Sequence, residues 1–212
     1  MHPSLKWFVA TAIPLSIIAG TALSASAGQV RIELLDVKCG NTEDVTGADE
    51  FYILGALSDG NSTQAALTSP FSINDGQIRY FDPTQQVIFD AYVPEGDVVR
   101  GGLKAFDEDF GKDWSNYGPV VNQITSVVVA TLAASGEPHA VTASQILNYG
   151  VKGFDFFAAR DKDDELGKVE LNIPASGPNI EEKTWHFQRK ASWWNPGYST
   201  WNYTVRYRIT RF

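Results

Sequence analysis

The final twelve residues of the chain alternate between apolar and polar side chains. The apolar positions are Trp201, Tyr203, Val205, Tyr207 and Ile209, and the polar positions between them are Asn202, Thr204, Arg206, Arg208 and Thr210. A repeat of two places alternate side chains on opposite faces of a strand. The pattern therefore predicts a half-buried antiparallel strand, and the dry face of its sheet needs a second layer to cover it.

Further segments are rich in β-branched and aromatic residues and are bounded by turn residues, which is typical of strands. They are Val30–Lys38, Phe51–Leu57, Gln77–Tyr80, Gln86–Tyr92, Val98–Phe106, Gly153–Ala159 and Lys168–Ile173. Together with the C-terminal strand, they predict a mainly β fold, an antiparallel β-sandwich of about eight strands.

One stretch between the predicted strands has a helical repeat instead. Apolar residues recur at helical spacing from Val120 to Ala134, after the pair Gly118-Pro119. A second, short helix is expected over Thr142–Leu147, with Thr142 as its N-cap. The sequence thus predicts a helical insertion at about residues 119–148.

The N-terminus has the order of a secretory signal peptide. Lys6 precedes an apolar run over residues 7–18, and small residues follow, ending in Ala25-Ser26-Ala27. This order predicts cleavage before Gly28, a single exported domain over 28–212, and a secreted or periplasmic location. The alternative is a retained anchor, but Pro14 interrupts an apolar run that is shorter than the roughly 20 residues of a membrane span. No later segment is long and apolar enough to span a membrane.

Charge and cysteine content restrict the function further. The formal net charge of −8 disfavours nucleic-acid binding, which requires clustered cationic side chains. Cys39 is the only cysteine, so no disulfide can form within the chain, and zinc sites built on several thiolates are excluded. We expect Cys39 to be a buried side chain at the end of a strand.

Acidic residues gather in segments 43–52, 107–113 and 161–167, each of which we expect to be a loop that follows a strand. Aspartate is also an ordinary turn residue, so any one of these loops taken alone is better explained as a solvated turn. Calcium takes about six to eight oxygen ligands, which several loops at one end of a sandwich can supply together. The recurrence of three acidic loops therefore favours calcium binding.

Two parts of the chain resemble the calcium-binding loops of C2 domains. The segment from Asp44 to Ile53 is similar to the family's first loop, D-x-x-G-x-S-D-P-Y-V, with Glu50 in place of the proline. Both 87–109 and 157–169 are similar to the approach to the family's third loop, so two segments compete for one loop. The resemblance implies a C2-like sandwich with Ca²⁺ as its cofactor. The metal ligands that it implies are Asp44 and Asp49, with either Asp161, Asp163 and Asp164 or Asp107, Asp109 and Asp113.

Aromatic and basic residues form a second group near the C-terminus. Trp193 and Trp194 lie in a turn-like segment and are candidates for contact with a lipid, a sugar or a partner, although rings of this kind more often fill a core. Five cations, which would form a positive face or a solvated one, are Arg189, Lys190, Arg206, Arg208 and Arg211.

The sequence contains none of the nucleophile-elbow, zinc-protease, P-loop or dinucleotide-binding motifs. The leading prediction is an exported calcium-binding module that mediates calcium-dependent binding to a membrane or to an extracellular protein. The alternative is a secreted hydrolase or carbohydrate-binding domain in which calcium is structural.

Overall fold

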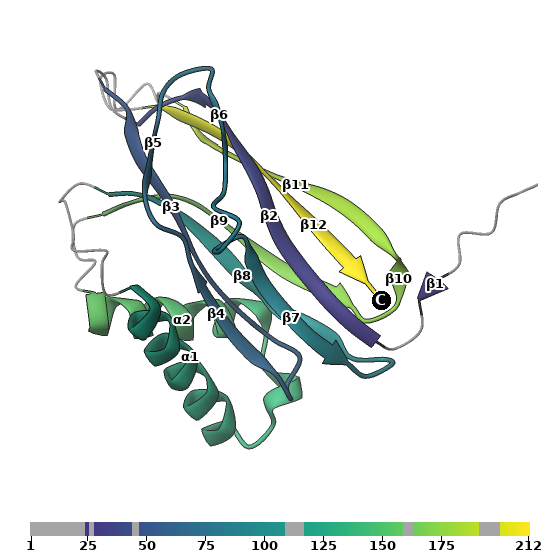
Figure 1. Ribbon diagram of the computed structural model, residues 1–212. Helices are drawn as coiled ribbons and strands as arrows, with labels where there is room; N and C mark the ends of the chain where they lie inside the picture. Colours follow the sequence, from purple (N-terminus) through teal and green to yellow (C-terminus); the bar gives the residue numbers. More distant parts are fainter. Residues whose placement is uncertain (1–23, 26–27, 44–46, 109–116, 159–162, 191–199) are drawn as a thin grey trace, which may run out of the picture.

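The computed structural model describes residues 24–25, 28–43, 47–108, 117–158, 163–190 and 200–212 (Figure 1). Two antiparallel sheets pack face to face, which confirms the predicted sandwich. In the first sheet, the strands in order are β11 (Ile180–Arg189), β12 (Trp201–Arg211), β2 (Gly28–Asn41) and, along one edge, β6 (Ile78–Tyr80) and β7 (Val87–Val93). In the second sheet, the edge formed by β4 (Thr63–Leu67) and β5 (Phe71–Ile73) is followed by β3 (Asp49–Ser58), β8 (Val98–Asp107) and β9 (Asp164–Pro174).

Each sheet has five strands but four strand positions. In each sheet, two short strands follow one another along the same edge and share one position. Strands β6 and β7 both pair with β2, and β4 and β5 both pair with β3. The predicted number of about eight strands therefore matches the number of strand positions.

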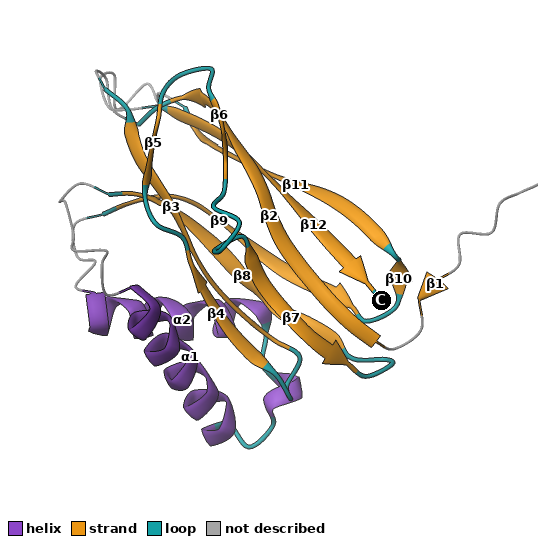
Figure 2. Cartoon of the chain, viewed as in Figure 1, coloured by secondary structure: helices purple, strands orange, loops and turns teal. Residues whose placement is uncertain are grey.

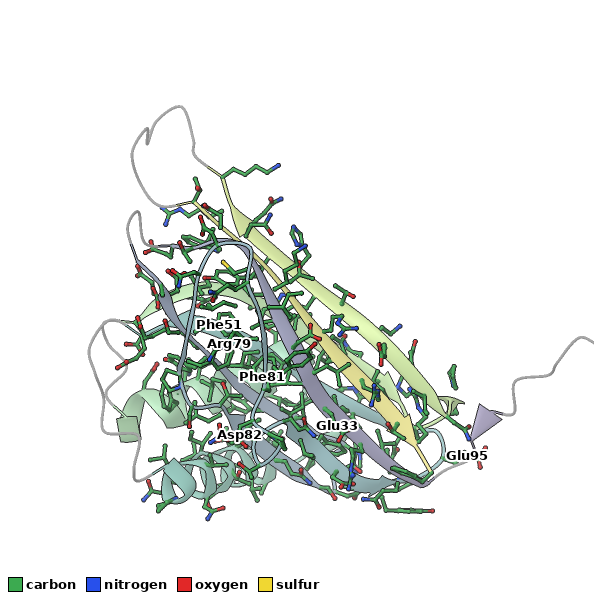
Figure 3. All side chains as sticks on the ribbon, turned by 45° about the horizontal axis from the view of Figure 1, so that its top comes forward. Glu33, Phe51, Arg79, Phe81, Asp82 and Glu95 are labelled. Carbon is green, nitrogen blue, oxygen red and sulfur yellow. The ribbon has the colours of Figure 1, made fainter. Side chains whose placement is uncertain are left out.

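The core between the sheets is built from the inward positions of the alternating strands. On β12 the predicted apolar face is buried, from Trp201 to Ile209. Phe71 lies 5.7 Å from Phe51 and 5.7 Å from Phe81, measured between ring centroids, and so links the two sheets near their open edge. Figure 3 labels Phe51 and Phe81 in this cluster, next to Arg79, whose guanidinium lies 5.9 Å from the Phe71 ring.

Two helices, α1 (Tyr117–Ala134) and α2 (Ala143–Ala158), cover the outer face of the second sheet (Figure 2). They bury a separate apolar cluster that includes Tyr52 and Phe106 of the sheet. Close approach of α2 requires glycine at position 150, because a Cβ there would lie 2.7 Å from that of Ala56. Thr142 caps α2 as predicted: its hydroxyl accepts from the Gln145 amide at 3.3 Å, and Gln145 Oε1 accepts in return from Thr142 N at 3.0 Å.

The helical insertion is longer than predicted, and the predicted strand Gly153–Ala159 is wrong. Residues up to Ala158 continue α2, whose buried positions Ile146, Gly150 and Phe154 recur every four residues. The glycine interrupted the apolar repeat, which hid this face from the sequence pattern. Strand β11 was not predicted, because only Trp185 and Phe187 of its ten residues are buried.

Strand β2, the central strand of the first sheet, begins at Gly28, the residue predicted to become the N-terminus after cleavage. A two-residue strand before it, β1 (Ser24–Ala25), pairs with β10 (Gly177–Pro178). The rest of the predicted signal segment lies outside the described residues. No helix among the described residues combines the length and apolar character needed to cross a membrane.

Candidate functional site

The end of the sandwich at which β2 ends and β3 begins brings together described residues of the three acidic segments, and we call it the loop end. Asp107 at the end of β8 lies opposite Phe51 of β3 on one side and opposite Asp164 of β9 on the other. The first sheet reaches the same end, because Trp201 at the start of β12 donates its indole N–H to the Leu166 carbonyl of β9 at 2.7 Å.

The sheet topology shows how the two segments that resemble the third C2 loop are related. Strands β8 and β9 are hydrogen-bonded neighbours, and both helices lie between them in the chain. The acidic end of one segment therefore begins the connection between β8 and β9, the acidic part of the other ends it, and the helical insertion lies between them. The expectation that the third acidic segment follows a strand is wrong, because it follows α2, but it still returns to the loop end.

Asp49 is the most deeply buried of the predicted ligands that the structure describes, with no exposed surface. Its Oδ2 accepts a hydrogen bond from the Glu43 amide at 2.6 Å and another from the hydroxyl of Tyr203. Because Tyr203 belongs to β12, this contact joins the two sheets. A buried carboxylate with two donors is held in one orientation.

Asp107 and Asp163 are also buried, with 3% and 9% of their surface exposed. Asp107 Oδ1 accepts from the Glu50 amide at 2.7 Å, which ties the end of β8 to the start of β3. Asp163 Oδ2 accepts from the hydroxyl of Tyr52 at 2.6 Å. Carboxylates from three segments of the chain are thus fixed at the loop end by hydrogen-bond donors.

The other predicted ligands divide into two groups. Asp164 is described and exposed. The remaining four, together with the predicted contact residues Trp193 and Trp194, lie outside the described residues: they are Asp44, Asp109, Asp113 and Asp161. Within the part of the chain that the structure describes, no three acidic, histidine or cysteine side chains are close enough to hold a metal ion together. The described carboxylates alone therefore do not make a calcium site.

Tyr203, which donates to Asp49, lies in register with Cys39 of the neighbouring strand β2. Burial, and then the hydrogen bond to the Asp49 carboxylate, raise the pKa of Tyr203 far above its usual range. Burial raises the pKa of Cys39 to about 11, so its thiol stays protonated at neutral pH. Cys39 is a buried side chain near a strand end, as expected.

Sequence reasoning missed Tyr52 and Tyr203 as partners of the acidic residues. Their hydroxyls reach Asp163 and Asp49 across 111 and 154 positions of sequence, and no local pattern reports such a contact. The available signal was a polar-tipped aromatic on an otherwise apolar strand face, since a buried phenol needs a hydrogen-bond partner.

Three of the five C-terminal cations do not form a free positive face. Arg206 binds Asp36 through Nε at 3.0 Å, and Arg208 binds Glu182 through Nη2 at 2.7 Å. Arg211 is buried and donates to the carbonyls of Pro174 and Pro178 at 3.2 and 2.9 Å. The aromatic side chains of β11 and β12 are core residues, as the more common use of such rings predicts.

Comparison with known proteins gives similarity at the level of structure. No protein-family model matches the sequence, and no curated protein is detectably similar to it in sequence. The structure is similar to that of a C2 domain, with a TM-score of 0.38 and 15% identity, over 86% of this chain and 96% of the other. It is similar to a C2 domain of plant extended synaptotagmin 1, with a TM-score of 0.40 and 10% identity, over 88% of this chain and 97% of the other.

A third similar structure is human GIVD cytosolic phospholipase A2, with a TM-score of 0.38 and 12% identity. That match covers 89% of this chain but only 17% of the phospholipase.

Proposed function

We propose that the protein is an exported calcium-binding module that attaches to a membrane surface when calcium is bound. The observation that carries this proposal is the convergence of Asp49, Asp107 and Asp163, from three segments of the chain, at one end of the sandwich. Solvated turns would leave these carboxylates exposed. Instead they are buried and oriented by hydrogen-bond donors, as the carboxylate ligands of a divalent cation are.

The same connections carry the acidic residues needed to complete a calcium site. The connection from β2 to β3 contains Asp44, and the divided connection from β8 to β9 contains Asp109, Asp113 and Asp161. Calcium needs about six to eight oxygen ligands, more than the three buried carboxylates supply. We propose that calcium is held by residues of both connections and screens the repulsion among them.

Export is supported by the agreement between the predicted cleavage position and the start of the folded domain. Cleavage before Gly28 leaves β2 intact from its first residue and removes the two-residue strand β1. The main-chain pairing between β2 and β12 extends to Val30 and is unaffected.

Sedimentation with phosphatidylserine-containing vesicles tests this function, with calcium and with a chelator in excess. We expect the protein to sediment only with calcium, and Asp163→Asn to reduce sedimentation while Glu95→Gln, an exposed residue at the opposite end, leaves it unchanged. Equal sedimentation with and without calcium would contradict the proposal. Calcium binding without vesicle binding would favour the alternative, a hydrolase or carbohydrate-binding domain in which calcium is structural.

A further inference from the structure

A pocket of about 360 Å³ opens at the loop end, where three strands of the first sheet begin or end. Its lining residues come from the ends of three neighbouring strands and the residues next to them: Asn41, Gln188, Arg189, Lys190, Thr200, Trp201 and Asn202. The lining includes two cations and, among the described residues, no carboxylate. In a chain with a formal net charge of −8, this is a local reversal of charge.

Three side-chain amides line up across this pocket. Asn202 of β12 lies in register with Gln188 of β11 on one side and with Asn41 of β2 on the other. Gly40 leaves room for this arrangement, because a Cβ at that position would come within 3.2 Å of the Asn202 amide. The row lies on the polar face of β12, opposite the face that fills the core.

The wall of the pocket is held in place by contacts that do not require a ligand. Asn41 donates to the Thr200 hydroxyl at 2.8 Å and also to the Thr200 carbonyl. The Arg189 guanidinium lies 5.1 Å from the centroid of the Trp201 ring, and the Trp201 indole is fixed by Leu166. Stacking on a buried ring leaves the in-plane N–H groups of a guanidinium available to a ligand.

Arg189 and Lys190 differ from three other cations of the first sheet. The structure pairs Arg206, Arg208 and Lys183 with carboxylates of the same sheet. For Arg189 and Lys190, the described residues provide no such ion pair. Two cations beside a row of amide and hydroxyl groups are suited to a compact oxyanion, which accepts several charge-assisted hydrogen bonds at once.

We infer that this pocket binds a phosphomonoester group, through Lys190 with Gln188 and Asn202 as further donors, and with Arg189 at its edge beside the core-facing Trp201. The inference does not depend on calcium at the acidic segments, because none of its residues belongs to them. The shared chemistry is a terminal phosphate, which either a lipid headgroup or a soluble phosphate can present. At the membrane-facing end that we propose, the pocket would add a second contact beside the calcium site.

The test uses the purified protein with excess chelator, so that its outcome is independent of the calcium proposal. Vesicles of phosphatidylcholine with phosphatidic acid form one arm, and inorganic phosphate, followed by NMR of the side-chain amides, forms the other. The substituted pair is Arg189→Gln with Lys190→Gln. The matched control is Lys183→Gln with Arg208→Gln, which removes the same charge from the same sheet, and Asn202→Asp is a near-isosteric second variant.

We expect inorganic phosphate to shift the amide signals of Gln188 and Asn202 in the wild type. The pocket pair should weaken phosphate binding roughly tenfold, as the loss of charge-assisted hydrogen bonds implies, and Asn202→Asp should also weaken it. The control pair should leave it nearly unchanged. Sedimentation with phosphatidic acid vesicles in addition would identify a lipid headgroup as a source, and amide shifts without sedimentation would identify soluble phosphate.

Two results would overturn the inference. One is an equal loss of phosphate binding in the Arg189→Gln, Lys190→Gln variant and in the control variant. That result would mean that only the net charge of the protein matters. The other is the absence of both amide shifts and sedimentation in the wild type, with the fold shown to be intact by circular dichroism.

Discussion

The two ends of the sandwich use acidic residues in different ways. At the loop end, Asp49, Asp107 and Asp163 are buried and receive hydrogen bonds from other elements. At the opposite end, β7 turns into β8 through residues 94–97, where the Asp97 amide donates to the Pro94 carbonyl at 3.0 Å and Glu95 is exposed. Figure 3 shows Glu95 at this end of the molecule.

Carboxylates in ordinary turns and carboxylates at the loop end differ in their hydrogen-bond partners. Asp82, in another turn, is exposed and accepts from the Thr84 amide at 2.8 Å and the Thr84 hydroxyl at 2.7 Å, which lowers its pKa. This carboxylate stabilises its own turn, and within the described residues it makes no hydrogen bond or ion pair to another element. The loop-end carboxylates instead join β3 to β8, β12 and the start of β9. Long-range partners and burial, more than the abundance of aspartate, therefore mark the candidate site.

The largest expected effect comes from removing Asp49. In Asp49→Ala, the buried Tyr203 hydroxyl and the Glu43 amide lose their acceptor, which should lower the free energy of unfolding by about 3 kcal/mol. Glu95→Ala at the opposite end should change it by less than about 0.5 kcal/mol. Urea denaturation with excess chelator measures both. Similar small changes in the two variants would remove the distinction between the ends.

The next effect is a loss of stability at high pH. Burial raises the pKa of Cys39 from an ordinary value of 9.0 to about 11, so the folded protein keeps a proton that the unfolded chain releases. Stability should therefore fall as the pH rises from about 9 to 11, by at most about 1.4 kcal/mol per pH unit from this group. The raised pKa of Tyr203 acts in the same direction above pH 10.

Cys39→Ala isolates the contribution of the thiol. Unfolding free energies measured across this pH range should decrease less steeply in the variant than in the wild type. Parallel curves would show that Cys39 does not titrate differently in the folded and unfolded states.

A smaller effect is expected from Tyr52→Phe. The substitution removes the hydroxyl that donates to Asp163 at 2.6 Å while keeping the ring stacked on Phe106, 5.2 Å away between centroids. It should cost about 1.5 kcal/mol, the contribution of a hydrogen bond to a charged group. Tyr92→Phe, at an exposed position near the opposite end, is the control and should be close to neutral in urea denaturation. A neutral Tyr52→Phe would show that Asp163 does not depend on this donor.

Much of the fold was predictable, because alternation is a local property of a strand. Strand β12 and the main strands β2, β3 and β8 follow directly from the pattern of side chains. The end of α2 was mistaken for a strand for two reasons. Gly150 and Gly153 interrupt its apolar face, and the phenylalanines that follow Gly153 are residues that favour strands. Strand β11 is exposed along most of its length, and its alternation is limited to the buried pair Trp185 and Phe187.

The candidate site was predictable only in part. Acidic segments can be read from the sequence, but the pairing of Asp107 with Asp164 depends on two strands separated by both helices. Because of this long-range pairing, the two segments that resemble the third C2 loop contribute to one connection. The tyrosine donors come from β3 and β12, and their roles arise only when the two sheets are packed.

The most direct test of the account is calorimetric titration of calcium into the chelator-stripped protein, with Asp49→Asn, Asp107→Asn and Asp163→Asn beside the Glu95→Gln control. The account predicts calcium binding in the wild type and the control, and a loss of affinity of roughly tenfold or more in each loop-end variant, because each removes a charged oxygen from one shared site. Unchanged affinity in the three variants, or no calcium binding by a folded wild type, would contradict it.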